Sequence, residues 1–178
     1  MSNYRRVFIQ NSYVFLTVIT NNRSHILIKN IELLREAFRN VGRIYKYKII
    51  ACVILPEHLH IILYPENIKE YPKIISSIKH YFSANLDIKM VELSASKIKK
   101  REKGIWLRRY IEHTIVSEDD LNKHINYIHY NPVKHGYAKN VKDWEYSSFH
   151  KFVKLKNYDE NWGSGSSDIE NIKKLDYE

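Results

Sequence analysis

The fold is decided by the stretch Tyr47-Lys-Ile-Ile-Ala-Cys-Val-Ile-Leu-Pro-Glu-His-Leu-His-Ile-Ile-Leu-Tyr64. Its two runs of β-branched, aliphatic and aromatic residues predict strands at 47–55 and 58–64. Pro56-Glu57 separates them, and so short a break predicts a hairpin of antiparallel strands. The stretch therefore predicts the central hairpin of a sheet.

The second strand of this hairpin begins with His58-Leu59-His60. Side chains two residues apart in a strand point to the same face, so both imidazoles can reach one divalent ion. An isolated His-x-His pattern more often marks surface or satisfied core histidines. Here the pair follows a strand break directly and precedes a run of apolar residues, which favours a metal-binding site.

Further elements flank the hairpin on both sides. Dense β-branched and aromatic residues predict a strand, and apolar residues at helical spacing predict helices. The last helix follows Ser117, an N-cap residue with acids after it, and is expected to end at Asn131-Pro132. The predicted bounds are 12–20 and 105–116 for strands, and 31–45, 70–86 and 121–130 for helices. The segment 87–103 is less legible and is expected to be a loop, with a short strand at 90–93 as an option.

This order of elements predicts an α+β fold. We expect a central, mostly antiparallel sheet of four to five strands, with helices packed chiefly on one face. Residues 1–162 are expected to form a single domain. A polar C-terminal tail is expected at 163–178, where a Gly-Ser-Gly-Ser-Ser tract begins.

Composition limits the partners and the compartment. The chain has 178 residues and a formal charge of +9, which favours a polyanionic partner without separating DNA, RNA and an anionic membrane surface. A single cysteine excludes internal disulfides and suits a reducing cytoplasm. No apolar stretch has the length of a membrane span and no signal-peptide pattern opens the chain, so we expect a cytoplasmic protein without a membrane partner.

Tyr127 and Asn131 lie four residues apart on the last predicted helix. Residues at this spacing share a face on adjacent turns, so a phenol and an amide oxygen can face one point. Most of the 14 tyrosines must nevertheless be core or surface aromatics, and Asn before Pro is an ordinary helix terminator.

A basic run with interleaved aromatics precedes this helix. Such a segment can hold a phosphate backbone by charge and stack unpaired bases, or it can be a solvated loop. The candidate DNA-binding residues, together with one lysine of the second helix, are Lys79, Lys97, Lys99, Lys100, Arg101, Arg108 and Arg109.

Four segments in order carry a resemblance that extends over residues 4–162. They are Ile54-Leu-Pro-Glu-His-Leu-His-Ile-Ile-Leu63, Gly104-Ile-Trp-Leu-Arg-Arg-Tyr-Ile-Glu-His-Thr-Ile115, Tyr127-Ile-His-Tyr-Asn-Pro-Val-Lys-His-Gly136 and Asp143-Trp-Glu-Tyr-Ser-Ser-Phe149. Together they resemble the REP-associated tyrosine transposases, a bacterial branch of the single-tyrosine HUH transposases. The resemblance implies a HUH nuclease fold of ferredoxin-like type.

The resemblance also implies an activity. His58 and His60 would be the metal ligands, Tyr127 the nucleophile, and Asn131 the third metal-facing group. The reaction would cleave and join single-stranded or hairpin DNA through a 5′-phosphotyrosine intermediate. Phosphate chemistry favours Mg²⁺ or Mn²⁺ as the divalent metal ion, and imidazole ligands favour Mn²⁺. Glu57 departs from the Asn that relatives usually carry, so it could reach the ion or alter DNA contacts.

Two rival functions stay open at this point. One is a domesticated hairpin-DNA-binding protein without mobilising activity, and the other is a replication-initiator or relaxase-type HUH nuclease. The Asn131-Pro132 pair after the tyrosine favours the transposase branch. This branch is expected to work as a monomer rather than as a homodimer.

Overall fold

The computed structural model describes residues 8–87, 104–165, 172, 175 and 177. Four strands form one antiparallel sheet in the order β2-β3-β1-β4. The strands are β1 (Val14–Ile19), β2 (Tyr47–Ile54), β3 (His58–Pro65) and β4 (Ile111–Thr114), and the α-helices are α1 (Ile31–Ile44), α2 (Tyr71–Asn85), α4 (Glu118–Lys134) and α5 (Phe149–Lys154). The predicted α+β class, the order of the described elements and the antiparallel hairpin are confirmed. The loop expected at 87–103, with its optional strand at 90–93, lies outside the described residues from residue 88 on.

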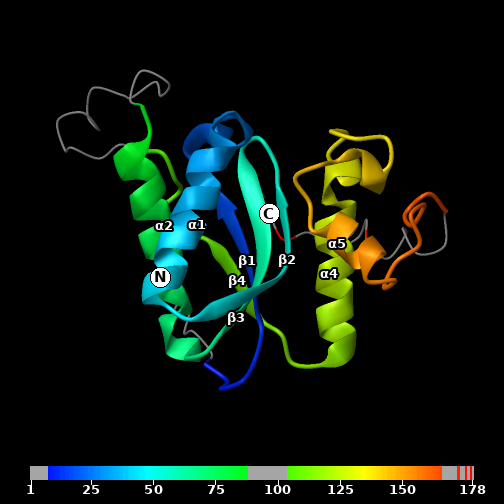
Figure 1. Ribbon diagram of the computed structural model, residues 1–178, viewed down its shortest axis with the longest axis horizontal. Helices are drawn as coiled ribbons and strands as arrows, with labels where there is room; N and C mark the ends of the chain where they lie inside the picture. Colours follow the sequence, from blue (N-terminus) through cyan, green and yellow to red (C-terminus); the bar gives the residue numbers. More distant parts are fainter. Residues whose placement is uncertain (1–7, 88–103, 166–171, 173–174, 176, 178) are drawn as a thin grey trace.

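The helices cover both faces of the sheet. In Figure 1, α1 and α2 lie on one side of the strands, and α4 and α5 lie on the other. Each side has its own apolar core, one under α1 and α2 and one under α4. The expectation of helices chiefly on one face was therefore wrong, because the buried strands are apolar on both faces and each face needs cover.

The central strand β3 divides its side chains between these two cores. Leu59, Ile61 and Leu63 pack under α1 and α2, whereas Ile62 packs under α4. His58 and His60 have the parity of Ile62, so the alternation of a strand directs both imidazoles toward α4. The predicted shared face is confirmed.

Two predicted boundaries differ from the structure. The strand expected at 105–116 is limited to β4, with one isolated bridge at Trp106. Helix α4 continues through Pro132 to Lys134 instead of ending at it. Proline tolerates this position because it lies in the last turn, where its missing N–H removes one hydrogen bond, and His135 N still donates to Asn131 O at 3.0 Å.

Three described residues of the expected polar tail contact the domain. Ile172 is buried, and Leu175 and Tyr177 pack against the core under α4. The boundary at residue 162 stays a prediction, but these residues return to the sheet. Among the described residues, no helix combines the length and apolar character needed to cross a bilayer.

Candidate metal and tyrosine site

The two histidines of β3 are fully buried under α4. The ring centroids of His58 and His60 lie 4.8 Å apart, with the rings nearly perpendicular. Burial among protein side chains restricts each ring to a fixed orientation. What each imidazole can bind then depends on which nitrogen carries its proton.

A threonine of β1 fixes the proton on His60. Thr17 Oγ1 lies 2.8 Å from His60 Nδ1, and the same hydroxyl donates to the carbonyl oxygen of Tyr177 at 2.8 Å. A hydroxyl has one proton, so Thr17 accepts from His60 and Nδ1 carries the ring proton. The Nε2 atom of His60 therefore presents a lone pair, as a metal ligand must.

Glu57 fixes His58 in the same form. Its Oε1 lies 3.0 Å from His58 Nδ1, and its Oε2 accepts a hydrogen bond from the Tyr137 hydroxyl at 2.9 Å. Burial favours the protonated carboxyl, but these hydrogen bonds outweigh it and hold the pKa of Glu57 at about 2. The carboxylate accepts from Nδ1, which leaves the Nε2 lone pair of His58 as the ligand atom.

One stripe of α4 lies over this histidine pair. The Tyr127 ring centroid is 5.1 Å from that of His60, and the His135 ring centroid is 5.2 Å from that of His58. Asn131 lies halfway between these two residues on the same helix face. It is fully buried, and its amide oxygen and nitrogen make no hydrogen bond among the described residues.

The donor set of this site fits a divalent ion. Two imidazole Nε2 atoms of fixed tautomer and one buried amide oxygen are ligands that suit Mn²⁺ and related metals. Three protein ligands leave coordination positions for a substrate. The prediction that His58, His60 and Asn131 hold a metal therefore has a geometric basis.

Tyr127 is fully buried and has a cation beside it. Lys134 Nζ lies 3.3 Å from the Tyr127 hydroxyl, and it also donates to the carbonyl oxygen of Leu175 at 3.1 Å. The ring of Tyr177 packs edge-on against Tyr127, with centroids 5.1 Å apart. The C-terminal residues thus cover the tyrosine side of the site.

The structure describes three of the candidate DNA-binding residues, and these belong to α2 and to the segment before β4. Lys79 is on α2, where its Nζ donates to the carbonyl oxygen of Leu107 at 2.7 Å and holds the segment before β4. Arg108 and Arg109 are exposed in that segment. Lys97, Lys99, Lys100 and Arg101 lie outside the described residues. DNA contact by all of these residues stays a prediction.

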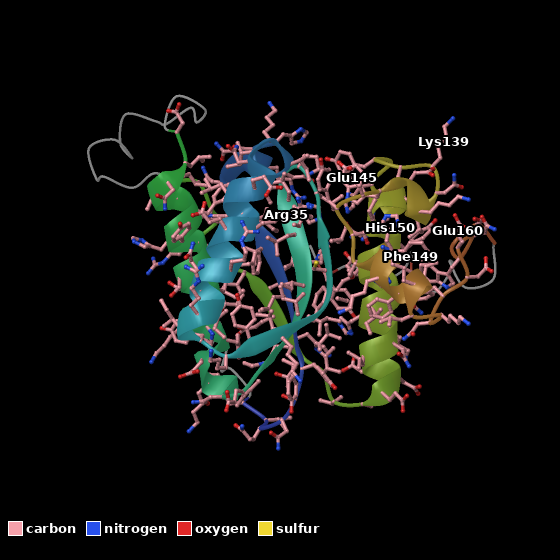
Figure 2. All side chains as sticks on the ribbon, in the orientation of Figure 1. Arg35, Lys139, Glu145, Phe149, His150 and Glu160 are labelled. Atoms are coloured by element: carbon pink, nitrogen blue, oxygen red, sulfur yellow. The ribbon has the colours of Figure 1, made fainter. Side chains whose placement is uncertain are left out.

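Three other histidines have structural partners. His113 Nε2 is 2.8 Å from Asp120 Oδ2, and His124 Nδ1 is 3.1 Å from Asp120 Oδ1, so one carboxylate ties β4 to α4. His129 Nε2 is 2.8 Å from Ser148 Oγ, and its ring packs against Phe149 of α5, which lies beside α4 (Figure 2). Burial lowers the pKa of His129 to about 3.

Sequence reasoning missed three contributors to the site. Thr17 gave no signal, because a threonine in a buried strand is ordinary until its cross-strand partner is known. Lys134 could have been found, since it lies seven residues after Tyr127 and therefore on the same helix face. Tyr137 lies beyond the helix, and only the tertiary fold brings it to Glu57.

Comparison with known proteins agrees with this architecture. Residues 8–131 match the family described as Transposase IS200 like. The REP-associated tyrosine transposase of Escherichia coli strain K12 is 35% identical over 95% of both chains, and a Haemophilus influenzae protein given the same name provisionally is 40% identical over 95% of this chain and 97% of its own. A solved structure of a REP-associated tyrosine transposase bound to a REP hairpin is similar with a TM-score of 0.77 at 36% identity, over 93% of each chain.

The fold and these relatives define a tyrosine transposase, a class of enzymes that cleave DNA. The chain belongs to the IS200-like transposases and, among them, to the REP-associated tyrosine transposases.

Proposed function

We propose that this protein cleaves and rejoins single-stranded DNA beside a hairpin, with a divalent metal ion and a covalent bond between Tyr127 and the 5′-phosphate. The observation that carries the proposal is the packing of Tyr127 against His60, with Lys134 at the phenol oxygen. A nucleophile, a metal-binding pair and a cation lie together. The similar solved structure holds a hairpin, which supports a hairpin substrate.

His58, His60 and Asn131 would hold the ion. Mg²⁺ or Mn²⁺ bound there supplies positive charge to the scissile phosphate oxygens. Thr17 and Glu57 keep the two imidazoles in the form that binds a cation.

The chain supplies the nucleophile itself. The Tyr127 phenol loses its proton to solvent, and the Lys134 ammonium stabilises the phenolate. The phenolate oxygen forms a bond to phosphorus while the bond to the 3′-oxygen breaks, and that oxygen takes a proton from water. Attack by another 3′-hydroxyl reverses the step, so strands are rejoined without a nucleotide cofactor.

One copy of the chain holds every group of this site. Tyr127 packs against His60 of its own chain, so we propose that it acts within its own subunit and that a monomer is sufficient. Light scattering of the protein on a sizing column, with and without DNA, measures the oligomeric state. A dimer that forms only with DNA and is required for cleavage would contradict this part of the proposal.

The test of the chemistry uses two tyrosines of α4. Wild-type protein, Tyr127→Phe and Tyr130→Phe are incubated with labelled single-stranded hairpins and Mn²⁺, and adducts are separated on a denaturing gel. Tyr130 is also buried on α4, so it controls for loss of a phenol from this helix. We expect adducts from wild type and Tyr130→Phe but none from Tyr127→Phe. Hairpin binding without an adduct in any folded form would favour the binding-only alternative.

A further inference from the structure

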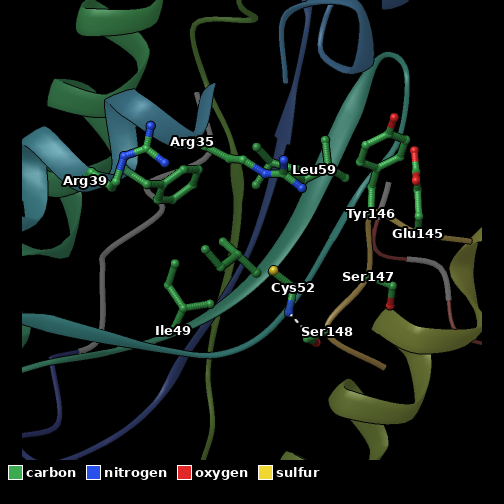
Figure 3. A pocket seen from close by; sticks show the side chains of 12 residues that line it. Arg35, Arg39, Ile49, Cys52, Leu59, Glu145, Tyr146, Ser147 and Ser148 are labelled. Carbon is green, nitrogen blue, oxygen red and sulfur yellow. Dashed lines mark hydrogen bonds between the residues drawn. The ribbon is translucent and has the colours of Figure 1, made fainter. Parts of the chain in front are cut away.

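A cavity lies on the side of β3 opposite the histidines. It has a volume of about 330 Å³ and lies between α1, strands β2 and β3, and the segment 145–148 (Figure 3). Leu59 and Ile61 form part of its apolar floor. These residues alternate with His58 and His60 along β3, so the sheet separates this cavity from the proposed cleavage site.

Two arginines, one carboxylate from Glu145 and one aromatic ring form its rim. Arg35 and Arg39 contribute from adjacent turns of α1, and Tyr146 contributes from the opposite side. The wider view of Figure 2 shows the same arrangement, with Arg35 on α1 to one side of the sheet edge and Glu145, the neighbour of Tyr146, to the other. The Ser147 hydroxyl accepts from the backbone N–H of Phe149 at 3.1 Å, so its own proton can be donated to a ligand.

We propose that this cavity receives one unpaired nucleotide of the DNA substrate, with its base against Tyr146 and its phosphate at Arg35 and Arg39. This inference rests on the proposed function. A volume of this size accommodates a nucleobase and part of its sugar. Unpaired bases bind proteins by stacking on aromatic rings, and guanidinium groups bind phosphate through paired N–H donors.

The charge at the mouth of the cavity favours a nucleotide as its ligand. The lining holds two arginines against one carboxylate, that of Glu145, and Arg35 also pairs with Glu32 on α1. The remaining positive charge at the mouth of an apolar slot, in a chain that is strongly basic as a whole, favours an anion that carries a flat apolar part. A nucleotide of the substrate has both parts. Because the cavity is across the sheet from Tyr127, its occupant contributes to recognition of the DNA and not to bond breakage.

The test couples protein variants to DNA variants. Dissociation constants are measured for a hairpin with single-stranded flanks and for a series in which each unpaired base in turn is removed to leave an abasic site. We expect loss of one particular base to weaken binding by wild-type protein about tenfold. Tyr146→Ala should weaken binding of the intact DNA by a similar factor and should lose no further affinity at that abasic position.

Arginine variants separate the phosphate contact from general charge. Arg39→Ala should weaken binding and reduce the salt dependence by about one phosphate contact. Arg43→Ala is the control, because Arg43 is an exposed arginine of α1 outside the cavity lining. The Arg43→Ala protein should lose as much affinity as the wild-type protein when the base at that abasic position is removed. Since Arg39 is exposed, its variant should fold even if Tyr146→Ala does not, and thermal melting checks both.

The covalent adduct distinguishes this inference from the chemistry. At saturating DNA, the Tyr146 and Arg39 variants should form the Tyr127 adduct at the wild-type rate, since only binding is altered. Normal adduct formation together with an abasic series that shows no coupling to Tyr146 or Arg39 at any position would overturn the inference. Coupling at one position without any adduct would support the cavity and refute the proposed chemistry.

Discussion

The ammonium group of Lys134 lies 3.3 Å from the phenol oxygen of Tyr127, and 4.9 Å from the centre of its ring, two turns along the same helix. A cation at this distance favours the phenolate over the phenol. The same helix that presents the proposed nucleophile therefore also presents the group that we propose activates it.

Removal of this charge should make adduct formation more dependent on pH. Lys134→Met should slow formation of the Tyr127 adduct about tenfold near neutral pH, because the phenolate loses the cation beside it. The deficit should shrink toward about pH 9, where more phenolate forms without help. Single-turnover rates across this range, at saturating DNA and Mn²⁺, measure the effect, and Lys134→Arg should retain most of the rate. An equal deficit at every pH would indicate a purely structural role for Lys134.

Loss of the Thr17 hydroxyl should weaken metal binding. Thr17→Val keeps the shape of the side chain but removes the acceptor for His60 Nδ1. Metal sites that lose such a partner of a ligating histidine bind about 10-fold to 100-fold more weakly. Titration calorimetry with Mn²⁺ measures the change, and Thr17→Ser, which restores a hydroxyl, should recover the affinity. The unfolding free energy should fall by about 1–2 kcal/mol in the valine variant. Unchanged Mn²⁺ affinity in a folded Thr17→Val protein would separate Thr17 from the metal site.

The single cysteine should react slowly in the folded protein. Burial raises the pKa of the Cys52 thiol from 9.0 to about 11. Only the thiolate reacts with iodoacetamide, so at about pH 9 the folded protein should react roughly 50-fold more slowly than the unfolded chain. The rate should still be rising steeply near pH 10, where an ordinary thiol is already about nine-tenths ionised. Because there is one cysteine, mass spectrometry assigns the reaction without ambiguity. A half-maximal rate already near pH 9 would show that Cys52, which lines the cavity beside α1, is open to solvent.

Removal of the C-terminal residues should make Tyr127 more accessible. Tyr177 packs against Tyr127 and accepts a hydrogen bond from Thr17, and Leu175 accepts one from Lys134. A chain that ends at residue 171 loses these contacts, so adduct formation at subsaturating DNA should rise about tenfold, equivalent to about 1.4 kcal/mol of competition removed. The melting temperature should fall, because Ile172 is buried in the core. A truncated protein that stays folded and reacts more slowly would show that these residues assist the reaction.

Local periodicity was sufficient to predict the central strands and part of the site. The two-residue spacing of His58 and His60 and the four-residue spacing of Tyr127 and Asn131 each determine a face, and the structure brings His60 and Tyr127 together. Periodicity cannot predict which helix or strand packs against each face. The cover of α4 on the second face of the sheet, and the contact between Thr17 and His60, depend on strand and helix placement. Lys79 is a further example, because its charge is visible in the sequence but its hydrogen bond to Leu107 is not.

Because side chains alternate along β3, the proposed cleavage site and the proposed DNA-recognition cavity can change independently. Residues of one parity face the histidine site, and residues of the other parity face the cavity beside α1. Under the two roles proposed above, substitutions at positions such as Leu59 should retarget the protein to different DNA while the residues proposed to cut it are left untouched. A library of variants at the cavity wall, selected on new hairpins, is the form that such engineering would take.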